Sequence, residues 1–423
     1  MKIAIIGTGI SGLSCAFALQ KDFDIHVFER AERIGGHTAT VDVNHEGETF
    51  AIDTGFIVFN DWTYPKFISL LSGLGVESQA SDMSFSVSSQ ASNIEYAGTN
   101  LNALFAQRKN ILNPTYWRML KDILRFNREA VEDLQTGAID DKTLLGNYLQ
   151  ERGYSEAFKR WYLIPMGSAI WSSSLNEMMA FPLKFFVAFF KNHGLLNVMD
   201  RPQWRVIKGG SSSYLGPLTE GFKDRIRLNC QITRIVRRQN GARLEFAGAG
   251  YEDFDAVVFA CHADTVLSLL ADPSEDELSI LSALPYRSNR VVLHTDESLL
   301  PVNKRAWASW NYLLDNDPSR APTLSYNMNM LQGIKSNSTF IVTLNAEDKI
   351  DPAKIIRCFD YEHPVFTHAG VAAQNRKQVI DGKRNTWFCG AYWKNGFHED
   401  GCVSGLNVAE DIQKRLGNFK ACA

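Results

Sequence analysis

Three glycines near the N-terminus could bring the backbone close to the phosphates of a dinucleotide. Gly7, Gly9 and Gly12 belong to a G-T-G-I-S-G run. Glycine permits a tight turn and, without a side chain, lets a pyrophosphate approach the backbone. A helix beginning here would offer unpaired N–H groups and the positive end of its dipole to the phosphates. We therefore predict a phosphate-binding turn, with Ile10 and Ser11 as further contacts.

Two short strands and a helix must position these glycines. Residues 2–6 (KIAII) are typical of an apolar strand, residues 13–20 have helical apolar spacing, and residues 24–28 (DIHVF) resemble a second strand. Glu29 follows, twenty-two residues beyond Gly7, where an acid accepts hydrogen bonds from an adenosine ribose. This order favours a dinucleotide site over a purely structural turn.

The motif does not choose between NAD and FAD. The acidic Glu29 argues against NADP, because a carboxylate repels the 2′-phosphate, although the neighbouring Arg30 weakens that argument slightly. A second glycine pair, Gly35 and Gly36 in R-A-E-R-I-G-G-H, could also pass close to a cofactor. Arg33 could neutralise a phosphate there, and a flexible surface turn is the alternative.

These motifs, followed by a strand at 48–53 and by D-T-G-F, resemble the N-terminal signature of the flavin-containing amine oxidase superfamily. That superfamily includes phytoene-desaturase-like and protoporphyrinogen-oxidase-like enzymes. Plain NAD-binding proteins lack the second glycine pair. The resemblance implies FAD, with Gly35 and Gly36 near its pyrophosphate and ribitol. It also implies contacts from Arg30, His37, Thr54, Gly55 and Phe56. The S-G-G-C-Y context of a covalent flavin cysteine is absent, so we expect FAD to be bound non-covalently.

Later segments extend the resemblance. W-R-V-I-K-G-G-S-S-S-Y-L (204–215) is similar to the loop by which the chain re-enters the FAD domain. I-T-R-I-V-R-R (232–238) resembles the segment that packs on the adenine, with backbone contacts from Val236. A strand at 255–260 is also expected to end at the cofactor.

Residues 385–405 resemble the second FAD motif, in which a strand ending at Gly390 is followed by a loop and a helix beginning near Val403. The resemblance therefore implies that residues 7–12 and 390–405 converge on one FAD. The acid that usually follows the strand glycine is Ala391 here, so Glu399 or Asp400 is the predicted ribitol contact. The resemblance also carries cofactor contacts onto Gly401 and Ser404.

A narrower resemblance covers essentially the whole chain. G-F-H-E-D-G, I-P-M-G-S-A-I-W-S and F-F-K-N-H-G-L-L resemble bacterial predicted FAD-dependent oxidoreductases related to the N-terminal part of plant cyclopropane-fatty-acid synthases. Genes of that group commonly lie near fatty-acid-modifying methyltransferases. The resemblance implies a functional link to such a methyltransferase and a role in lipid metabolism.

Three residues near the second motif could act as a base or polariser, namely His398, Lys394 and Glu399. A lone histidine is more often structural, but one in a loop that is expected to face the flavin could take part in the reaction. His37 is a weaker candidate and is expected to contact the cofactor. Cys402 would lie near the flavin, where we expect it to be a packing residue.

The composition is that of an ordinary soluble globular protein, with 45% hydrophobic residues, 22% charged residues and a net charge of −3. The chain has no excess of basic residues, so its composition does not indicate a protein that binds nucleic acid. Seven scattered cysteines without a CxxC pair indicate reduced thiols in a cytoplasmic protein and no metal site. No run of eighteen apolar residues is present, so we predict no membrane span.

A chain of 423 residues suits two or three domains. We predict an α/β protein with a Rossmann-like FAD-binding domain and a discontinuous α+β substrate domain. The FAD-binding domain would comprise 1–60, 205–270 and 385–423, and the substrate domain 61–204 and 271–384.

Within the substrate domain we expect long helices at 116–134 and 144–161 and an antiparallel sheet that includes 290–295, 323–330 and 339–345. Residues 181–196 carry five phenylalanines in their first ten positions. The favoured interpretation is a buried core helix. The alternatives are the wall of an apolar substrate tunnel and a face that touches a bilayer, which would make the protein membrane-associated.

Three functions remain open. The leading hypothesis is an FAD-dependent dehydrogenase or oxidase of a small hydrophobic substrate, such as a lipid or modified fatty-acyl chain. The second is an amine oxidase, for which Tyr392 and Trp393 could supply an aromatic cage. The third is an FAD-binding partner of a methyltransferase without turnover of its own.

Overall fold

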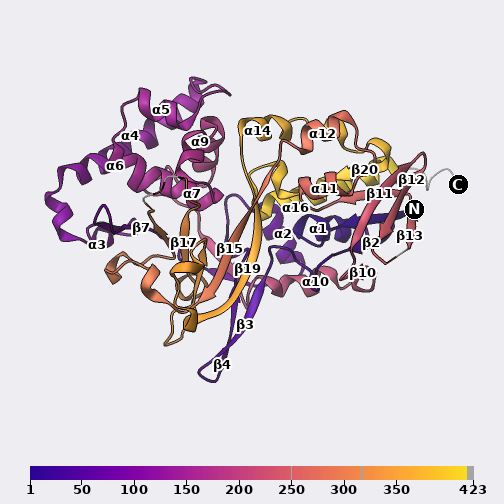
Figure 1. The fold of residues 1–423 in the computed structure, drawn as a ribbon, viewed down its shortest axis with the longest axis horizontal. Coiled ribbons are helices and arrows are strands. Elements are labelled where there is room, and N and C mark those ends of the chain that lie inside the picture. The colour runs from indigo at the N-terminus through magenta and orange to yellow at the C-terminus, as the bar shows by residue number, and fades with distance from the viewer. Residues whose placement is uncertain (249, 316, 318, 417–423) are drawn as a thin grey trace.

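A computed structural model of the chain describes residues 1–416 except 249, 316 and 318. Among these residues, five strands drawn from three distant segments form one parallel sheet at the right of Figure 1. In order across the sheet they are β10 (Ile226–Arg227), β2 (Asp24–Phe28), β1 (Lys2–Ile6), β14 (Ala256–Phe259) and β20 (Thr386–Phe388). The predicted α/β class and the strands at 2–6 and 24–28 are confirmed. The last residues of the predicted segment 385–423, at 417–423, lie outside the described residues.

Two helices from opposite ends of the chain cover one face of this sheet. They are α1 (Ile10–Leu19) and α16 (His398–Leu416). A side chain at Gly12 would collide with the carbonyl oxygen of Gly7, and one at Gly405 would collide with that of Ser11. Glycine therefore lets α1 approach the sheet and lets α16 approach α1 at backbone distance.

The other face of the sheet buries Ala4, Ile6, Val257 and Phe259 in a second apolar cluster. Elements on this side are the antiparallel strands β11 (Ile232–Arg238), β12 (Gly241–Phe246) and β13 (Tyr251–Phe254), and the helices α11 (Ala263–Leu269), α12 (Glu275–Leu281), α14 (His368–Gln374) and α15 (Lys377–Ile380). Buried residues of α12, α14 and α15 belong to the same cluster. These helices, predicted in the substrate domain, therefore pack with the half of the protein that contains the parallel sheet.

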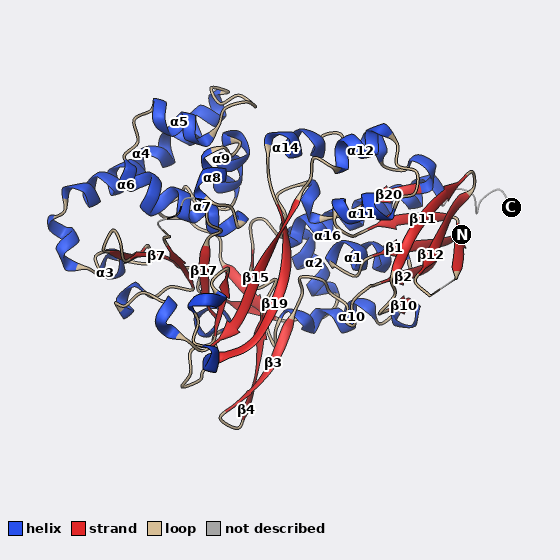
Figure 2. Ribbon diagram, in the orientation of Figure 1, coloured by secondary structure: helices blue, strands red, loops and turns tan. Residues whose placement is uncertain are grey.

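The other half of the protein is built on a second sheet, in the middle of Figure 2. In the described part of the chain, its seven strands are β19 (Ile355–Pro364), β15 (Tyr286–His294), β18 (Ile341–Leu344), β17 (Thr323–Asn327), β16 (Trp310–Leu313), β7 (Phe85–Ser89) and β8 (Ile94–Ala97), in spatial order. Neighbours are antiparallel except β16 and β7, which are parallel. The predicted strand 323–330 ends at Asn327, because the Asn327 side chain accepts from the N–H of Met330 and starts α13 (Met328–Gln332).

Helices at the left of Figure 1 complete this half. They are α3 (Leu101–Leu104), α4 (Pro114–Thr136), α5 (Leu145–Glu151), α6 (Glu156–Phe158), α7 (Ile164–Trp171), α8 (Leu175–Met179) and α9 (Leu183–Asn192). The predicted helix 116–134 is confirmed within α4. The predicted helix 144–161 is interrupted between α5 and α6, where the Ser155 side chain accepts from the N–H of Phe158 and begins a new helix.

The phenylalanine-rich segment forms α9 and the residues before it. Phe186 is 0% exposed and Phe190 is 1% exposed, and both pack in the core of the helical part. The core interpretation is confirmed for this face, and the interpretation as a bilayer-facing surface is wrong, because the rings point into the protein. Within the residues described, no helix combines the length and apolar character needed to cross a bilayer.

Smaller elements connect the two halves. They are the hairpin β3 (Thr40–His45) and β4 (Glu48–Asp53), the sheet of β5 (Phe59–Asn60), β9 (Trp204–Ile207) and β6 (Ser78–Ala80), and the helices α2 (Pro65–Gly73) and α10 (Leu215–Thr219). Phe67 and Leu71 of α2 pack with α1 and α16 in the half that contains the parallel sheet. The predicted boundary at residue 60 therefore precedes a helix that belongs to that half.

Asp53, at the end of β4, joins three parts of the chain. It is 0% exposed, and its carboxylate accepts from the Thr40 hydroxyl (2.7 Å), from the Ser211 N–H (2.7 Å) and hydroxyl (2.9 Å), and from the Gln332 side-chain amide (3.2 Å). Burial raises the pKa of Asp53 to about 6, against the opposing effect of the bonds from Thr40 and Ser211.

We predict that Asp53→Ala lowers the free energy of unfolding by about 3 kcal/mol, because it leaves buried donors of Ser211 and Gln332 without an acceptor. Chemical denaturation measures the change. Asp42→Ala, on the exposed side of the same hairpin, is the matched control and should be near neutral. Equal effects of the two substitutions would show that the Asp53 junction contributes nothing to stability.

Candidate functional site

The first glycine turn leaves open space in front of a helix N-terminus. Gly7 has a φ of +110°, and Gly9 begins α1 without any side-chain cap. A Cβ atom added at Gly9 would meet nothing within 4 Å. The unpaired N–H groups of the first helical turn therefore face a space with room for a phosphate.

The second glycine turn lies against the first. The Gly35 N–H donates to the carbonyl oxygen of Thr8 at 3.0 Å, and a Cβ at Gly36 would be 3.2 Å from the Cα of Gly9. The Arg33 guanidinium donates to the carbonyl oxygens of Gly36 (2.8 Å) and Thr38 (3.0 Å). Arg33 therefore stabilises the turn through these two hydrogen bonds. Because its guanidinium is engaged in them, the structure does not favour the predicted contact between this side chain and a phosphate.

Glu29 links the end of β2 to the first glycine turn. Its Oε2 accepts from the N–H (3.0 Å) and hydroxyl (2.6 Å) of Thr8, and its Oε1 accepts from the N–H of Ala31 (3.0 Å). The residue is half-buried and Arg30 is exposed beside it. Because Oε1 has one partner and a carboxylate oxygen can accept two bonds, an acceptor site remains for a ribose hydroxyl.

The C-terminal motif meets the first turn, as the sequence predicts. A Cβ at Gly401 would lie 2.7 Å from Cγ2 of Ile10 and 3.0 Å from Oγ of Ser11. The Ser404 hydroxyl accepts from the N–H of Gly390 at 3.1 Å. Convergence of residues 7–12 and 390–405 is thus confirmed, whereas their contacts with FAD remain a prediction.

Helix α16 begins at His398, five residues before the predicted start at Val403. His398, Glu399 and Asp400 therefore lie in its first turn and not in a loop. Two acids at this position stabilise the helix dipole.

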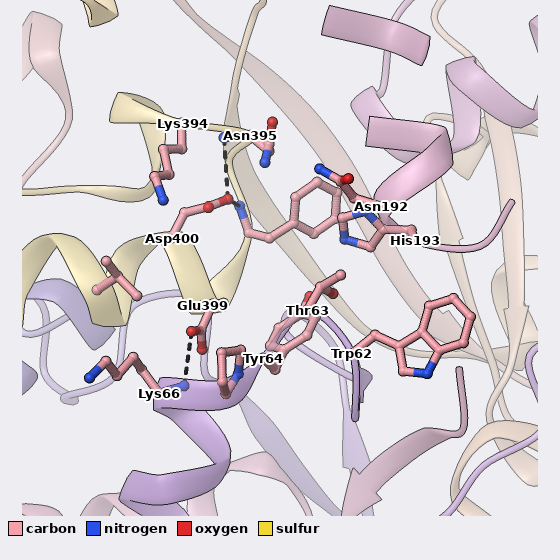
Figure 3. Close-up of a pocket in the computed structure, with 13 residues that line it drawn as sticks. Trp62, Thr63, Tyr64, Lys66, Asn192, His193, Lys394, Asn395, Glu399 and Asp400 are labelled. Carbon is pink, nitrogen blue, oxygen red and sulfur yellow. Dashed lines mark hydrogen bonds between the residues drawn. The ribbon is translucent and has the colours of Figure 1, made fainter. Parts of the chain in front are cut away.

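One side of this turn lines a cavity of about 510 Å³ (Figure 3), between the starts of α2 and α16 and the end of α9. Glu399 accepts from the N–H groups of Lys66 (2.9 Å) and Phe67 (2.8 Å), and so caps α2. Asp400 accepts from the N–H groups of Asn395 (3.2 Å) and Phe397 (3.0 Å). These bonds to the chain's own amides do not favour the predicted ribitol contact of either acid.

Burial also raises the pKa values of these two acids. It raises the pKa of Asp400 to about 6 and raises the pKa of Glu399 above its ordinary value, because the charged forms are poorly solvated. Lys394 is exposed at the edge of the same cavity. Lys394 and Glu399 therefore face the cavity, and the structure does not place them at the glycine turns.

His398 points to the opposite side of the helix. Its ring stacks on Phe56, with ring centres 3.7 Å apart, and its Nε2 shares a hydrogen bond of 2.9 Å with the Tyr214 hydroxyl. The same hydroxyl bonds Thr38 at 2.7 Å. Burial lowers the pKa of His398 to about 3, so the imidazole is neutral near pH 7. The three predicted catalytic residues are therefore not brought together.

Three histidines that sequence reasoning did not combine meet between the two halves. His37 follows the second glycine turn, His262 follows β14, and His363 lies on β19. The rings of His37 and His363 are 5.4 Å apart, the Ser172 hydroxyl bonds Nδ1 of His363 at 3.0 Å, and Glu362 bonds Nδ1 of His262 at 3.0 Å. The position of His262 after the predicted strand 255–260 and that of His37 after the second glycine pair were the available signals, and His363 carried none.

The histidine cluster is neutral near pH 7 and has an unused polar atom. Burial, together with neighbouring histidines, lowers the pKa of His37 well below its ordinary value, and burial lowers that of His363 to about 4. The buried Nε2 of His37 has no hydrogen-bond partner among the residues that the structure describes. An unpaired buried polar atom on the residue after the second glycine turn, which lies against the open turn at Gly9, fits residues arranged to hold a phosphate-containing dinucleotide.

Comparison with known families and structures agrees with this arrangement. The family model for flavin containing amine oxidoreductases matches residues 10–340. The structure resembles a putative protoporphyrinogen oxidase from Exiguobacterium sp. 255-15, at 16% identity and a TM-score of 0.69 over 98% of each chain. It also resembles cyclohexylamine oxidase from Brevibacterium oxydans IH-35A, at 16% identity and a TM-score of 0.68 over 98% of this chain and 99% of the other.

A third similar structure is a CLA-producing fatty acid isomerase from P. acnes, at 15% identity and a TM-score of 0.68 over 98% of each chain. No curated protein sequence matches the chain. At these identities the structural likeness shows a shared fold.

We predict that Gly9→Val folds but does not retain the cofactor. The space at Gly9 accepts a side chain, so the variant protein should fold as the wild type does. The valine side chain would, however, occupy the position proposed for the phosphates. Absorbance of the purified protein measures retention. Gly73→Val is the matched control, since a Cβ at Gly73 also meets nothing within 4 Å. A coloured Gly9→Val protein would contradict the assignment of this turn.

We predict that His398 makes the protein less stable as the pH falls below 6.5. The folded state holds the pKa near 3, so only the unfolded chain binds this proton between these values, and the loss at pH 5 is about 2 kcal/mol. Denaturation at pH 8 and pH 5 should therefore show a smaller loss for His398→Gln. Tyr214→Phe retains the histidine and should keep the loss. An unchanged loss in His398→Gln would show that this imidazole is accessible.

Proposed function

Because the chain belongs to the flavin-containing amine oxidoreductase family and is thus a flavin-dependent oxidoreductase, we propose that it binds FAD non-covalently and oxidises a hydrophobic, lipid-like substrate. The proposal has three parts, which are the identity of the flavin, the way it is held and the class of substrate. Each part draws on a different set of contacts.

FAD is favoured over FMN because the site has a place for an adenosine. The two glycine turns suit a pyrophosphate, and Glu29 retains an acceptor for a ribose hydroxyl. We propose that FAD is held by Gly7, Gly9, Ile10, Ser11, Gly12, Glu29, Arg30, Gly35, Gly36, His37, Thr54, Gly55, Phe56, Val236, Gly390, Gly401 and Ser404. Glu399 and Asp400 are omitted from this set because their carboxylates bind the chain's own amides.

Non-covalent attachment is supported by the state of the thiols near the C-terminal motif. Cys389 and Cys402 are 0% exposed, and burial raises the pKa of Cys402 to about 12 while the Ser14 hydroxyl lies 3.6 Å from its sulfur. A flavin thioether needs an accessible, deprotonated sulfur. The six cysteines that the structure describes are free, and Cys422 lies outside the described residues.

When bound, the flavin supplies an acceptor for a hydride from the substrate. The chain's own residues would orient the substrate and exclude water. His37 and His363, neutral near pH 7, can share hydrogen bonds without adding a positive charge to the site. His398 supports Phe56 by stacking, and its low pKa makes it a poor proton acceptor.

The observation that carries the choice of substrate is a row of aromatic rings, here called the aromatic row: Trp171, Phe185, Phe189, Phe366 and Phe397. Ring centres are 4.9 Å apart for Trp171 and Phe189, 5.3 Å for Phe185 and Phe366, and 5.0 Å for Phe189 and Phe397. Phe185 and Phe397 are only half-buried. Such rings suit an acyl chain or another apolar molecule better than a charged one.

The aromatic row ends beside the predicted cofactor contacts. Phe397 directly precedes His398, which stacks on Phe56. An apolar substrate lying along the row would therefore have one end near the flavin. The fatty acid isomerase among the similar structures shows that this fold is compatible with a fatty-acyl substrate.

An amine substrate is the second candidate, since cyclohexylamine oxidase and putrescine oxidase share the fold. Tyr392 and Trp393, the expected aromatic cage, do not favour it. Both are buried in the apolar cluster behind the parallel sheet, where Tyr392 packs on Gly390 and against Tyr286. A non-catalytic role beside a fatty-acid methyltransferase remains the third candidate and rests on the narrower resemblance in the sequence.

We predict that a lipid extract, and not an amine, bleaches the flavin under anaerobic conditions. Phe397→Ser should slow this bleaching by about tenfold, equivalent to about 1.4 kcal/mol, by removing the ring of the aromatic row that directly precedes His398 in the chain. Phe50→Ser, at a half-buried phenylalanine on β4, is the matched control and should leave the rate unchanged. Stopped-flow absorbance measures both rates.

Other outcomes of the same experiment separate the alternatives. Peroxide release with simple amines or polyamines, without bleaching by lipids, would show an amine oxidase. Flavin that no lipid or amine reduces would show a cofactor-binding partner without turnover.

A further inference from the structure

Large apolar side chains are exposed to solvent at the end of the protein formed by α3 and α4. Among the described residues, Leu112 is 88% exposed, Leu101 74%, Leu124 60%, Trp117 50% and Ile111 48%. All five lie between the start of α3 and the middle of α4. Scattered single apolar residues on a surface are ordinary, but a group from one segment indicates an interaction surface.

Contacts within the segment place these side chains on one surface. The Trp117 indole N–H donates to the carbonyl oxygen of Ile111 at 2.8 Å, so Trp117 lies beside Ile111 and Leu112. On α4, Trp117 and Leu124 are seven residues apart and therefore lie on the same side of the helix. Arg108 donates to the carbonyl oxygen of Asn102 at 3.2 Å, which brings the start of α3 to the same end.

One further exposed apolar residue, Val302, extends the surface from a distant part of the chain. Val302 is 87% exposed, and its N–H donates to Glu95 at 3.0 Å. The side-chain amide of Asn303 donates to the carbonyl oxygen of Ala106 at 2.8 Å, directly after α3. We call the six residues the end surface: Leu101, Ile111, Leu112, Trp117, Leu124 and Val302.

The end surface is positively charged although the chain is not. Residues 99–128 contain six lysines and arginines and one acid, whereas the whole chain has a net charge of −3. That acid, Asp122, is 1% exposed and lies 3.5 Å from Arg118 and 3.4 Å from Arg125, so it faces the protein. Arg108, Lys109, Lys121 and Arg128 are exposed beside the apolar residues of this segment, so the positive charge lies there. Near Val302 the basic side chains are balanced, because Lys304 lies 3.6 Å from Glu297 and Glu95 accepts from the N–H of Val302.

This surface lies far from the proposed flavin site. Figure 1 shows α3 and α4 at the end of the molecule opposite the parallel sheet and the N-terminus. The end surface does not contain residues proposed to bind FAD or substrate. Its role is therefore separate from the chemistry of the site.

We propose that the end surface binds the surface of an anionic lipid membrane. Leucine, isoleucine and tryptophan side chains can enter the boundary between headgroups and acyl chains, where tryptophan is favoured. Lysine and arginine beside them attract anionic headgroups. A protein partner would need a complementary acidic and apolar face, whereas a lipid surface requires only this interleaving of apolar and basic side chains. The membrane contact thus lies at α3, η1 (Arg108–Leu112) and α4, and not at α9.

Sedimentation with lipid vesicles tests the proposal on the full chain. Vesicles of phosphatidylcholine with one-third phosphatidylglycerol should bind the protein at least tenfold more tightly than vesicles of phosphatidylcholine alone, and added salt should weaken the binding. Equal binding to both vesicles, or binding to neither, would overturn the proposal.

A matched pair of triple variants locates the binding. Leu112→Ser, Trp117→Ser and Leu124→Ser together should weaken binding to the anionic vesicles at least tenfold. Tyr251→Ser, Leu278→Ser and Ile356→Ser, which alter three apolar residues exposed elsewhere, should leave it unchanged. Equal losses in the two variants, or none in the first, would overturn the assignment to the end surface.

Light scattering without lipid distinguishes a second copy of the chain as the occupant. The proposal expects the same mass for the wild-type protein and for the Leu112, Trp117 and Leu124 triple variant. A wild-type oligomer that this variant dissociates would show that the end surface is a protein interface. Vesicle binding requires no turnover, so its result is independent of the proposed oxidation of a lipid-like substrate.

Discussion

The backbone contact between α1 and α16 is the constraint on which the site depends. Two helices from opposite ends of the chain meet where Gly405 faces the carbonyl oxygen of Ser11 and Gly401 faces the side chains of Ile10 and Ser11. A larger residue at either glycine would push the helices apart. The separation of the first glycine turn from the start of α16 is therefore set by main-chain atoms, which hold a geometry more rigidly than side chains do.

The second half of the protein is tied to this contact by buried polar groups rather than by a continuous apolar core. Asp53 connects the β3–β4 hairpin to Ser211 and to Gln332 beside the seven-stranded sheet. Because the donors to the Asp53 carboxylate come from fixed directions, the two halves are held in one relative orientation. Within the half that contains the parallel sheet, Glu399 similarly connects α16 to the start of α2.

Local patterns in the sequence predicted the elements whose signals are local. The glycine run, the strands around it and α4 follow directly from turn chemistry and apolar periodicity. Residues of β19 were not predicted as a strand, because many of them are half-exposed and the strand is stabilised by pairing with β15 about seventy residues earlier. The start of α16 was placed too late, because its first turn is supported by residues of another segment.

The roles of the acids and histidines could not be predicted from the sequence either, because they depend on contacts with residues that are distant in the chain. Glu399 resembles a cofactor contact until its bonds to α2, more than three hundred residues away in sequence, are known. His398 appears reactive in sequence, yet Phe56 and Tyr214 enclose it. His37, His262 and His363 come from three segments, so no spacing in the chain could group them.

The discontinuous parallel sheet also determines when the protein can fold during synthesis. β20 begins at Thr386 and α16 begins at His398, so the outer edge of β14 and the apolar face of α1 lack their partners until these residues have been synthesised. A nascent chain carrying an unpaired strand edge and an uncovered helix is prone to aggregate. Synthesis of β20 and α16, rather than emergence of the N-terminal motif, is thus the event that allows the parallel sheet to close, and protection by a chaperone matters most before that moment.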